Sequence, residues 1–376
     1  MKLIKFLMLC CLIGSCSAQA VVINGPTPAT STLQNYEIPS GAPADVYLWH
    51  DDYPGTTLNY NSRYGSYICS YSSIRQTCSA QSTGSTITMI LKEKRSGMEH
   101  KLKLQAYQQS IYYDVNDPSQ SVYCGPRWAL TVFNSVNGCT GKSGDVTNNT
   151  KTLTVWIPQS EMNALPIGGV WEGQLKIGWN QLGGKGSFTY LANITLKGKA
   201  PGKQDIFFPE FNSANPLVQL DLHPVGSVTG NSYAEDVTTL DMCLYDGFNS
   251  NSDSMTLSFR DEGKSAPARQ NGEFSIYNTA NATTGESERI DYRVEMFNPH
   301  THSWMTMKNS EAVKISAGVN GQDQIRPVRL PSITYPVLCA PTPLRLTVKK
   351  FKVAQKSAGY YKGKLTVEFS PSLNSI

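Results

Sequence analysis

The side chains in this sequence best suited to binding chemistry are an arginine and the tyrosines around it. Arg63 is flanked by Tyr60, Tyr64 and Tyr67. A guanidinium group is planar and permanently charged, and it can form paired hydrogen bonds with a carboxylate. Tyrosine rings beside it would add flat apolar surface. The combination suits an anionic glycan, but it also fits a solvated strand that happens to carry one arginine, and the residues alone leave both interpretations open.

Two short motifs could carry metal or acid–base chemistry. Residues 49–52, with the sequence WHDD, place a histidine beside two acids, which could bind Ca²⁺ or transfer protons. The residues that follow, Tyr53-Pro54-Gly55, predict a turn at this point instead. Residues 300–302, HTH, offer two ligands without a clear third, so we interpret them as loop histidines. No nucleophile elbow, zinc-protease motif or phosphate loop occurs. We predict no catalytic residue, metal or other cofactor.

The cysteines indicate disulfides. Of nine cysteines, Cys10, Cys11 and Cys16 lie in the N-terminal leader. The even number that is left allows fifteen pairings in an exported chain. Proximity in the sequence favours three pairs, Cys69–Cys78, Cys124–Cys139 and Cys243–Cys339. A zinc site is disfavoured because no two of these cysteines have the close C-x-x-C spacing.

The N-terminus has the pattern of a secretory signal peptide. Lys2 and Lys5 precede an apolar run over residues 6–13, and small residues follow up to Ala18 and Ala20. We expect cleavage after one of these two alanines; the alternative is lipidation at Cys16. No other stretch is long and apolar enough to span a bilayer. The mature protein is therefore expected to be exported and soluble.

Composition and patterning predict an all-β protein. The 376 residues are 40% hydrophobic and only 16% charged, which is too apolar for a disordered chain. The net charge of +4 and the absence of long basic runs argue against a nucleic-acid partner. Short alternating runs with frequent turn signals are typical of β-sandwiches, and no long amphipathic helix is expected.

Several elements can be placed in the first half. Runs at 87–91 and 101–107 flank Arg95-Ser96-Gly97 and predict a hairpin. A strand is expected at 153–157, a helical turn at 159–165, and a strand pair at 168–177 and 186–196. Residues 21–43 read as a loose lead-in with an edge strand at 21–23, and 266–284 as a polar loop.

The chain divides near residue 200. The segment 196–203 is rich in Gly, Pro and Lys, so we expect a signal peptide at 1–20, a first domain at 21–199, a short linker at 200–202 and a second domain at 203–376. In the second domain, residues 239–260 predict two core strands around a polar turn. The last strand is expected at 362–369, and the tail after it is too polar to add another. This domain is therefore predicted to be a sandwich with an open edge.

The second domain also carries a family resemblance. Residues 241–247, DMCLYDG, and 336–339, PVLC, resemble the pilin domain of class 5 fimbrial tip adhesins, the colonization factor antigen I type built by the alternate chaperone–usher pathway. Upstream, residues 93–96, EKRS, and the segments 157–158 and 165–171, IP and LPIGGVW, continue the resemblance in order. It spans nearly the whole mature chain.

The resemblance implies an architecture and a set of partners. It implies two immunoglobulin-like β-sandwich domains in tandem, a receptor-binding one followed by an incomplete pilin domain, with the same three disulfides. The implied partners are a periplasmic chaperone, an outer-membrane usher, a major pilin that donates a strand, and a host glycoconjugate receptor. The implied location is the fimbrial tip on the cell surface, reached through the periplasm.

The resemblance also points to binding residues. It implies an arginine at the receptor-facing tip, in the strand before the first disulfide, and Arg63 matches that position. Arg127 and Lys185 are the next candidates for the same surface. The basic cluster that the family has in a later hairpin is absent, since residues 178–182 read GWNQL. The receptor is thus not identified. Two alternatives stay open: a non-adhesive minor pilin that initiates or caps assembly, and a secreted carbohydrate-active enzyme.

Overall fold

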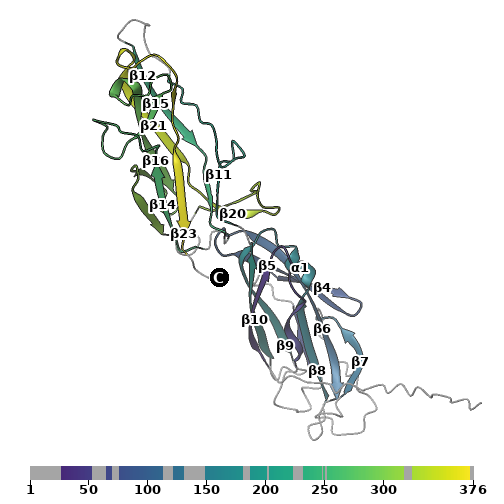
Figure 1. Ribbon diagram of the computed structural model, residues 1–376. Coiled ribbons are helices and arrows are strands. Elements are labelled where there is room, and N and C mark those ends of the chain that lie inside the picture. Colours follow the sequence, from purple (N-terminus) through teal and green to yellow (C-terminus); the bar gives the residue numbers. More distant parts are fainter. Residues whose placement is uncertain are drawn as a thin grey trace, which may run out of the picture.

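The chain forms two elongated β-domains placed end to end (Figure 1). The computed structural model describes residues 27–52, 65–69, 76–112, 122–130, 149–180, 187–200, 203–222, 232–247, 249, 252–316 and 324–372. Within these residues, no helix combines the length and the apolar character needed to cross a membrane.

The first domain is one ten-stranded sheet with the order β1-β10-β9-β5-β6-β8-β2, to which β3, β4 and β7 are added on β9, β5 and β6. Its strands are β1 (Ala29–Glu37), β2 (Val46–Asp52), β3 (Ser66–Ile68), β4 (Gln76–Gln81), β5 (Gly84–Glu93), β6 (Glu99–Tyr112), β7 (Val122–Trp128), β8 (Asn149–Ile157), β9 (Gly169–Asn180) and β10 (Ser187–Lys199). The helix α1 (Gln159–Asn163) follows β8. The predicted hairpin, helical turn and strand pair are confirmed as β5–β6, α1 and β9–β10.

Side chains join the two ends of this sheet across the domain. The backbone N–H of Thr27, just before β1, donates to the Asp52 carboxylate at the end of β2, with a shortest distance of 3.1 Å. The Trp49 indole N–H donates to the Thr27 carbonyl oxygen at 2.8 Å. The sheet therefore curls around a core in which Trp171 and Trp179 are fully buried.

Two predicted loops contain strands. β1 occupies most of the expected lead-in and runs parallel to β10, from the pair Ala29–Leu191 to the pair Glu37–Lys199. Its sequence signal is weak because Leu33 and Tyr36 are its only large apolar residues, and Tyr36 alone is buried. In the second domain, β15 (Phe274–Asn278) lies within the expected loop at 266–284. The edge strand expected at 21–23 lies outside the described residues.

The second domain has three sheets around its own core, ordered β11-β13-β20-β19, β12-β21-β16-β15-β22 with β17 on β16, and β18-β14-β23. Its strands are β11 (Asp205–Phe207), β12 (Tyr233–Leu240), β13 (Cys243–Tyr245), β14 (Ser254–Arg260), β15, β16 (Arg289–Asn298), β17 (Ser303–Met307), β18 (Ala312–Ser316), β19 (Arg326–Val328), β20 (Val337–Pro341), β21 (Leu344–Lys352), β22 (Tyr361–Lys362) and β23 (Thr366–Pro371). Short 3-10 helices lie at Glu286–Glu288 and Val353–Gln355. The two strands predicted within 239–260 are β13 and β14. They belong to different sheets and face the core from two sides.

The disulfides agree with the expected pairing where both partners are described. Cys243 is bonded to Cys339, with 5.8 Å between their Cα atoms, and joins β13 to β20. Cys69 is bonded to Cys78, with a Cα–Cα distance of 6.2 Å. Cys124 is also disulfide-bonded, while Cys139, its expected partner, lies outside the described residues.

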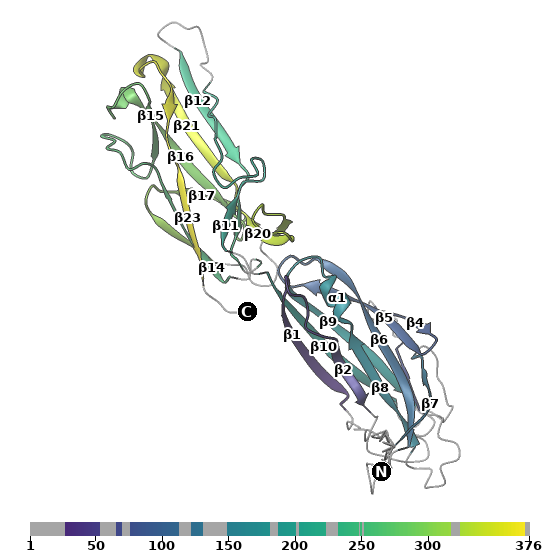
Figure 2. The same ribbon diagram turned by 45° about the vertical axis from the view of Figure 1, so that its right-hand side comes forward.

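The junction between the domains is packed with side chains. Ala200, Phe207 and Tyr245 form a buried cluster with Cys243 and Cys339, and Ile38 of the first domain packs against it. The Tyr245 hydroxyl donates to the Ala200 carbonyl oxygen at 3.0 Å. Figure 2 shows the same end-to-end arrangement from a second direction. The first domain thus presents the end remote from this junction as the far end of the molecule.

Candidate functional site

Arg127 is the predicted site residue whose position the structure describes. It lies on β7, toward the end of the first domain remote from the second domain (Figures 1 and 2). Arg127 is exposed, and its guanidinium carbon is 4.1 Å from the centre of the Tyr107 ring. A guanidinium stacked in this way keeps its N–H groups available at its edge. Arg63 and Lys185 lie outside the described residues, so their relation to Arg127 is still a prediction.

Arg127 is the first member of a row of side chains on the outer face of the sheet. The row, called the aromatic row below, consists of Arg127, Tyr107, Trp156, Tyr47 and His50, which come from β7, β6, β8 and β2. Tyr107 meets Trp156 edge-on at 6.1 Å between ring centres. Trp156 and Tyr47 stack at 6.0 Å with an interplanar angle of 27°, and Tyr47 and His50 are 4.6 Å apart. Because these strands are neighbours in the sheet, the side chains form a continuous surface.

Irregular pairing of β2 gives this surface its shape. The register between β2 and β8 shifts twice, between Tyr47 and Trp49 and again between Trp49 and Asp52. Such bulges redirect side chains. Trp49 and Asp52 are buried, whereas Tyr47 is 48% exposed and the His50 side chain 58% exposed.

The two adjacent acids of β2 serve different surroundings. Asp51 accepts a hydrogen bond from the Thr154 hydroxyl at 3.0 Å, whereas Asp52 accepts one from the Tyr190 hydroxyl at 3.2 Å inside the domain. Burial raises the pKa of Asp52 above its usual value, against hydrogen bonds from Thr27 and Tyr190 that lower it. They are therefore not an acid pair. The expectation that residues 51–52 lead into a turn is also wrong for these two residues, because β2 continues through Asp52.

A tyrosine on β7 connects Asp51 to the row. Burial raises the pKa of Tyr123, and its hydrogen bond to Asp51 raises it further. The Asp51 carboxylate is thus held by a threonine and a tyrosine beside the exposed rings. Elsewhere, His300 and His302 lie in the turn between β16 and β17, as expected for loop histidines. Within the described part of the chain, no three His, Cys, Asp or Glu side chains gather closely enough to hold a metal ion.

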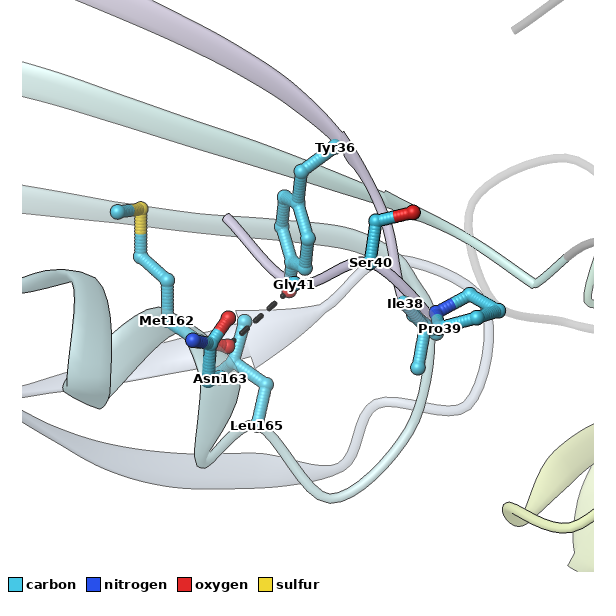
Figure 3. Close-up of a pocket in the computed structure, with 8 residues that line it drawn as sticks. All are labelled: Tyr36, Ile38, Pro39, Ser40, Gly41, Met162, Asn163 and Leu165. Atoms are coloured by element: carbon cyan, nitrogen blue, oxygen red, sulfur yellow. Dashed lines mark hydrogen bonds between the residues drawn. The ribbon is translucent and has the colours of Figure 1, made fainter. Parts of the chain in front are cut away.

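A pocket of about 300 Å³ lies near the domain junction (Figure 3). It is lined by Tyr36, Ile38, Pro39, Ser40, Gly41, Met162, Asn163 and Leu165. Tyr36 is its one ionisable side chain; its hydroxyl donates to the Met162 carbonyl, and burial raises its pKa to about 12. The pocket therefore holds no side chain that could exchange a proton near neutral pH.

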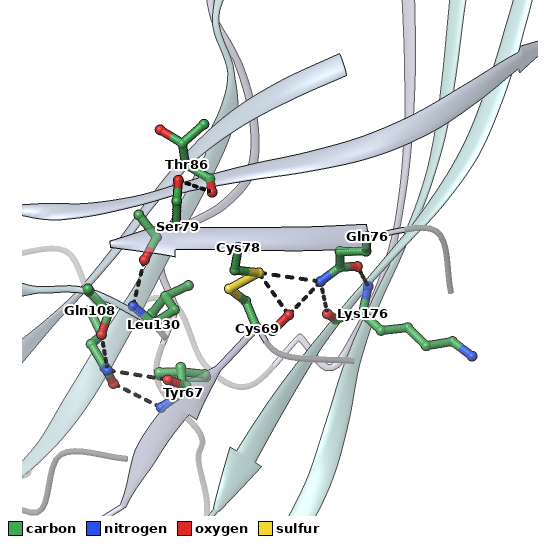
Figure 4. Close-up of a disulfide and its surroundings, with 11 residues drawn as sticks. Tyr67, Cys69, Gln76, Cys78, Ser79, Thr86, Gln108, Leu130 and Lys176 are labelled. Atoms are coloured by element: carbon green, nitrogen blue, oxygen red, sulfur yellow. Dashed lines mark hydrogen bonds between the residues drawn. A yellow bond between two sulfur atoms is a disulfide. The ribbon is translucent and has the colours of Figure 1, made fainter. Parts of the chain in front are cut away.

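Buried amide side chains hold the short strand β3 beside the aromatic row, as Figure 4 shows. Gln108 accepts a hydrogen bond from the Tyr67 N–H at 2.8 Å and donates to the Ala129 carbonyl at 2.9 Å. Gln76 donates to the carbonyl oxygens of Cys69 and Lys176, at 2.8 and 3.0 Å. Because β3 has only three residues, these bonds substitute for a longer strand ladder. They fix the segment that carries Cys69.

A buried lysine fixes the start of the same segment. The Lys151 ammonium donates to the Gly65 carbonyl oxygen at 3.0 Å and to the Ser66 hydroxyl at 3.3 Å. Burial lowers the pKa of Lys151 to about 8. Lys151 and the two glutamines were not singled out from the sequence, because nothing in their spacing shows that they are buried. Tyr47 and Trp156 were also missed, although each alternates with core residues along its strand.

Comparison with known proteins assigns the family. Two family models match the chain in succession: the first domain of the CFA/I fimbrial protein CfaE over residues 18–201, and its second domain over residues 204–373. The chain belongs to the CfaE family of CFA/I fimbrial proteins. Its all-β fold with two domains in tandem agrees with the fold expected from the sequence.

Individual members of the family are moderately similar to the chain. The CFA/I fimbrial protein CfaE of Escherichia coli is 30% identical over 292 residues, which span 77% of this chain and 72% of that protein. The crystal structure of CfaE, the adhesive subunit of CFA/I fimbria of enterotoxigenic Escherichia coli, matches with a TM-score of 0.60 and 25% identity, over 94% of this chain and 95% of that one. A chaperone–tip adhesin complex of CFA/I fimbriae matches in fold, with a TM-score of 0.51 and 24% identity over 94% and 98% of the two chains.

Proposed function

We propose that this member of the family is a fimbrial tip adhesin, with a first domain that binds a glycan receptor on host cells. The second domain would anchor it to the fimbrial shaft by accepting a strand from the major pilin. A periplasmic chaperone and an outer-membrane usher would deliver it to the cell surface. Its action is binding through surface contacts, without covalent chemistry.

The observation that carries this proposal is the edge strand β23. Within the described residues, β23 pairs with β14 on one side and has no strand on the other. Its side chains Val367 and Phe369, with Leu365 just before it, pack against the second core but are only partly buried. An edge that exposes apolar side chains favours pairing with another chain. A donated strand beside β23 would cover them.

A second segment shows the same incomplete burial. Residues 215–222 run without a strand partner, and Val218, Leu220 and Leu222 alternate with exposed residues while packing against the same core. The apolar surface that a donated strand could cover is therefore larger than β23 alone.

The N-terminal strand supports a position at the tip. A subunit inside a fimbrial shaft must accept one strand and donate another. In this chain β1 is paired with β10 along its full length and belongs to the first domain. It is therefore not available for a neighbouring subunit. A subunit that accepts a strand at β23 but keeps β1 for itself fits the end of a fibre.

Arg127 supports an anionic receptor. Its guanidinium is exposed on a flat aromatic support, a geometry that favours paired hydrogen bonds with a carboxylate. Arg63 and Lys185 are proposed to add positive charge to the same end of the domain. Binding would then weaken as salt rises.

The test is binding of the full chain, purified with its chaperone, to a glycan array and to host epithelial cells. We expect binding to both that decreases with ionic strength. A protein that is required for fimbrial assembly but binds neither would be the non-adhesive minor pilin. Release of sugar from a polysaccharide would support the carbohydrate-active enzyme instead.

A further inference from the structure

The part of the aromatic row farthest from Arg127 has no role in the proposed contact with an anionic group. Tyr47 and His50 are well exposed, and Trp156 is partly exposed, on strands whose other face fills the core. Large rings left in water on one continuous patch are a common feature of binding surfaces. The patch begins beside Arg127 and extends along the side of the domain.

The rings of this patch are already held in place. Tyr47 and Trp156 are direct partners on neighbouring strands, so their rings lie side by side. Trp156 is braced from the other side by the buried ring of Tyr107, which Arg127 covers. A ligand would therefore meet a surface that needs little ordering on binding, which lowers the entropic cost.

The polar groups beside the rings restrict what the ligand can be. Asp51 lies next to His50 and is held by Thr154 and Tyr123. Its negative charge would repel a second anionic group there, whereas Arg127 attracts one at the other end of the row. A sugar ring suits such a surface, because its C–H face packs on an aromatic ring while its hydroxyls donate to a carboxylate.

We infer that the receptor is an oligosaccharide laid along the aromatic row, with its anionic unit at Arg127 and neutral hexose units on Trp156, Tyr47 and His50. This rests on the proposed function and specifies it further: the recognised unit is a chain of several sugars, and most of its contact lies on the side of the domain. A protein strand is a poorer fit, because it would pair with the backbone edge of β2 and not with the ring faces.

The experiment compares inhibitors of adhesion of the full chain, in complex with its chaperone and coated on beads, to epithelial cells. The probes are two neutral sugars, lactose and the tetrasaccharide lacto-N-tetraose. We expect the tetrasaccharide to inhibit wild type at a roughly tenfold lower concentration than lactose, from the extra ring contacts. Inhibition by neither sugar, or equal inhibition by both, would overturn the inference.

Two substitutions separate stacking from folding. Tyr47→Ala should reduce adhesion about five- to tenfold and remove the advantage of the tetrasaccharide, whereas Tyr47→Phe keeps the ring and should adhere nearly as wild type. Tyr360→Ala is the matched control, because Tyr360 is 87% exposed and lies in the second domain.

The outcomes distinguish this inference from the proposed function. If wild type does not adhere to any cells, the proposed function fails and the inference with it. If wild type adheres and Tyr47→Ala adheres equally well, the inference alone fails. Adhesion that survives mild periodate oxidation of the cell-surface sugars would point to a protein receptor and would also overturn it.

Discussion

Buried polar side chains determine the local structure at the remote end of the first domain. Gln76 and Gln108 hold β3 through its backbone, and the Lys151 ammonium binds the backbone where that strand begins. Each of these side chains replaces hydrogen bonds that a longer strand would form. Their removal would leave buried carbonyl or N–H groups without partners, which costs about 1–3 kcal/mol each.

Lys151 gives a testable pH dependence. Burial lowers its pKa from 10.5 to about 8, so between these values the unfolded chain holds a proton that the folded chain has lost. The free energy of unfolding therefore gains a contribution that increases from pH 8 to 10.5, by up to about 3 kcal/mol. We expect wild type to gain stability relative to Lys151→Met over this range.

The measurement is unfolding in urea at several pH values, followed by tryptophan fluorescence. Trp304 is the one tryptophan beyond residue 200, so the signal reports mainly on the first domain. Taking the difference between the two proteins cancels the titration of all other groups. Curves for wild type and variant that stay parallel from about pH 7 to 10 would contradict the role given to Lys151.

At the scale of strands, the sequence predicted the elements with strong apolar alternation. β5, β6, β9, β10 and β14 were expected close to where they lie, since each alternates large apolar with polar residues. β1 was missed because its residues are mostly Ser, Thr and Asn, and its pairing with β10 depends on the tertiary fold. β15 was missed because it is a run of five residues between polar flanks.

The candidate site could be predicted only in part, for a reason that also lies in the strands. Arg127 was identified from its charge, and the structure places it on an exposed stack. The rest of the row depends on the two bulges in β2, which move Tyr47 and His50 to the outer face and Asp52 inside. A regular alternation read from the sequence cannot reveal such shifts.

The disulfide between β13 and β20 should matter more than the one beside β3. Cys243 and Cys339 are 96 residues apart, and a loop of about that length is stabilised by roughly 4–5 kcal/mol in the chain-entropy model. Cys69 and Cys78 are 9 residues apart, which corresponds to about 2–3 kcal/mol. We expect Cys243→Ser to lower the amount of exported protein more than Cys69→Ser, as measured by immunoblotting of periplasmic extracts. Equal loss for both variants would argue against this ranking.

The open edge at β23 gives a second prediction at this scale. The second domain expressed alone should aggregate, because Val367 and Phe369 are left partly exposed beside an unpaired edge. Fusing the N-terminal peptide of the major pilin to its C-terminus should yield a monomer, as measured by size-exclusion chromatography. A soluble, cooperatively folding domain without the peptide would contradict strand addition. Leu365→Asp, which disturbs the acceptor surface, should weaken the rescue.

At the scale of the whole molecule, the packed junction joins two domains with different tasks. The first domain presents the aromatic row along its side and Arg127 toward its remote end, while the second exposes β23. This division of roles was expected from the linker composition and from the family resemblance. The contacts of Ile38 and Ala200 with the cluster at Cys243 and Cys339 could not be read from sequence, because the fold brings these distant segments of the chain together.

The most direct test of this account is adhesion of the full chain with Arg127→Ala, compared with wild type and with Arg293→Ala. Arg293 is an exposed arginine on β16 of the second domain and gives the same change of charge. Hydrogen bonds to a charged group contribute about 1.5–3 kcal/mol, so Arg127→Ala should weaken adhesion roughly ten- to a hundredfold. Arg293→Ala should adhere as wild type does. Equal adhesion by all three proteins, or equal loss in both variants, would contradict receptor binding by the first domain through this surface.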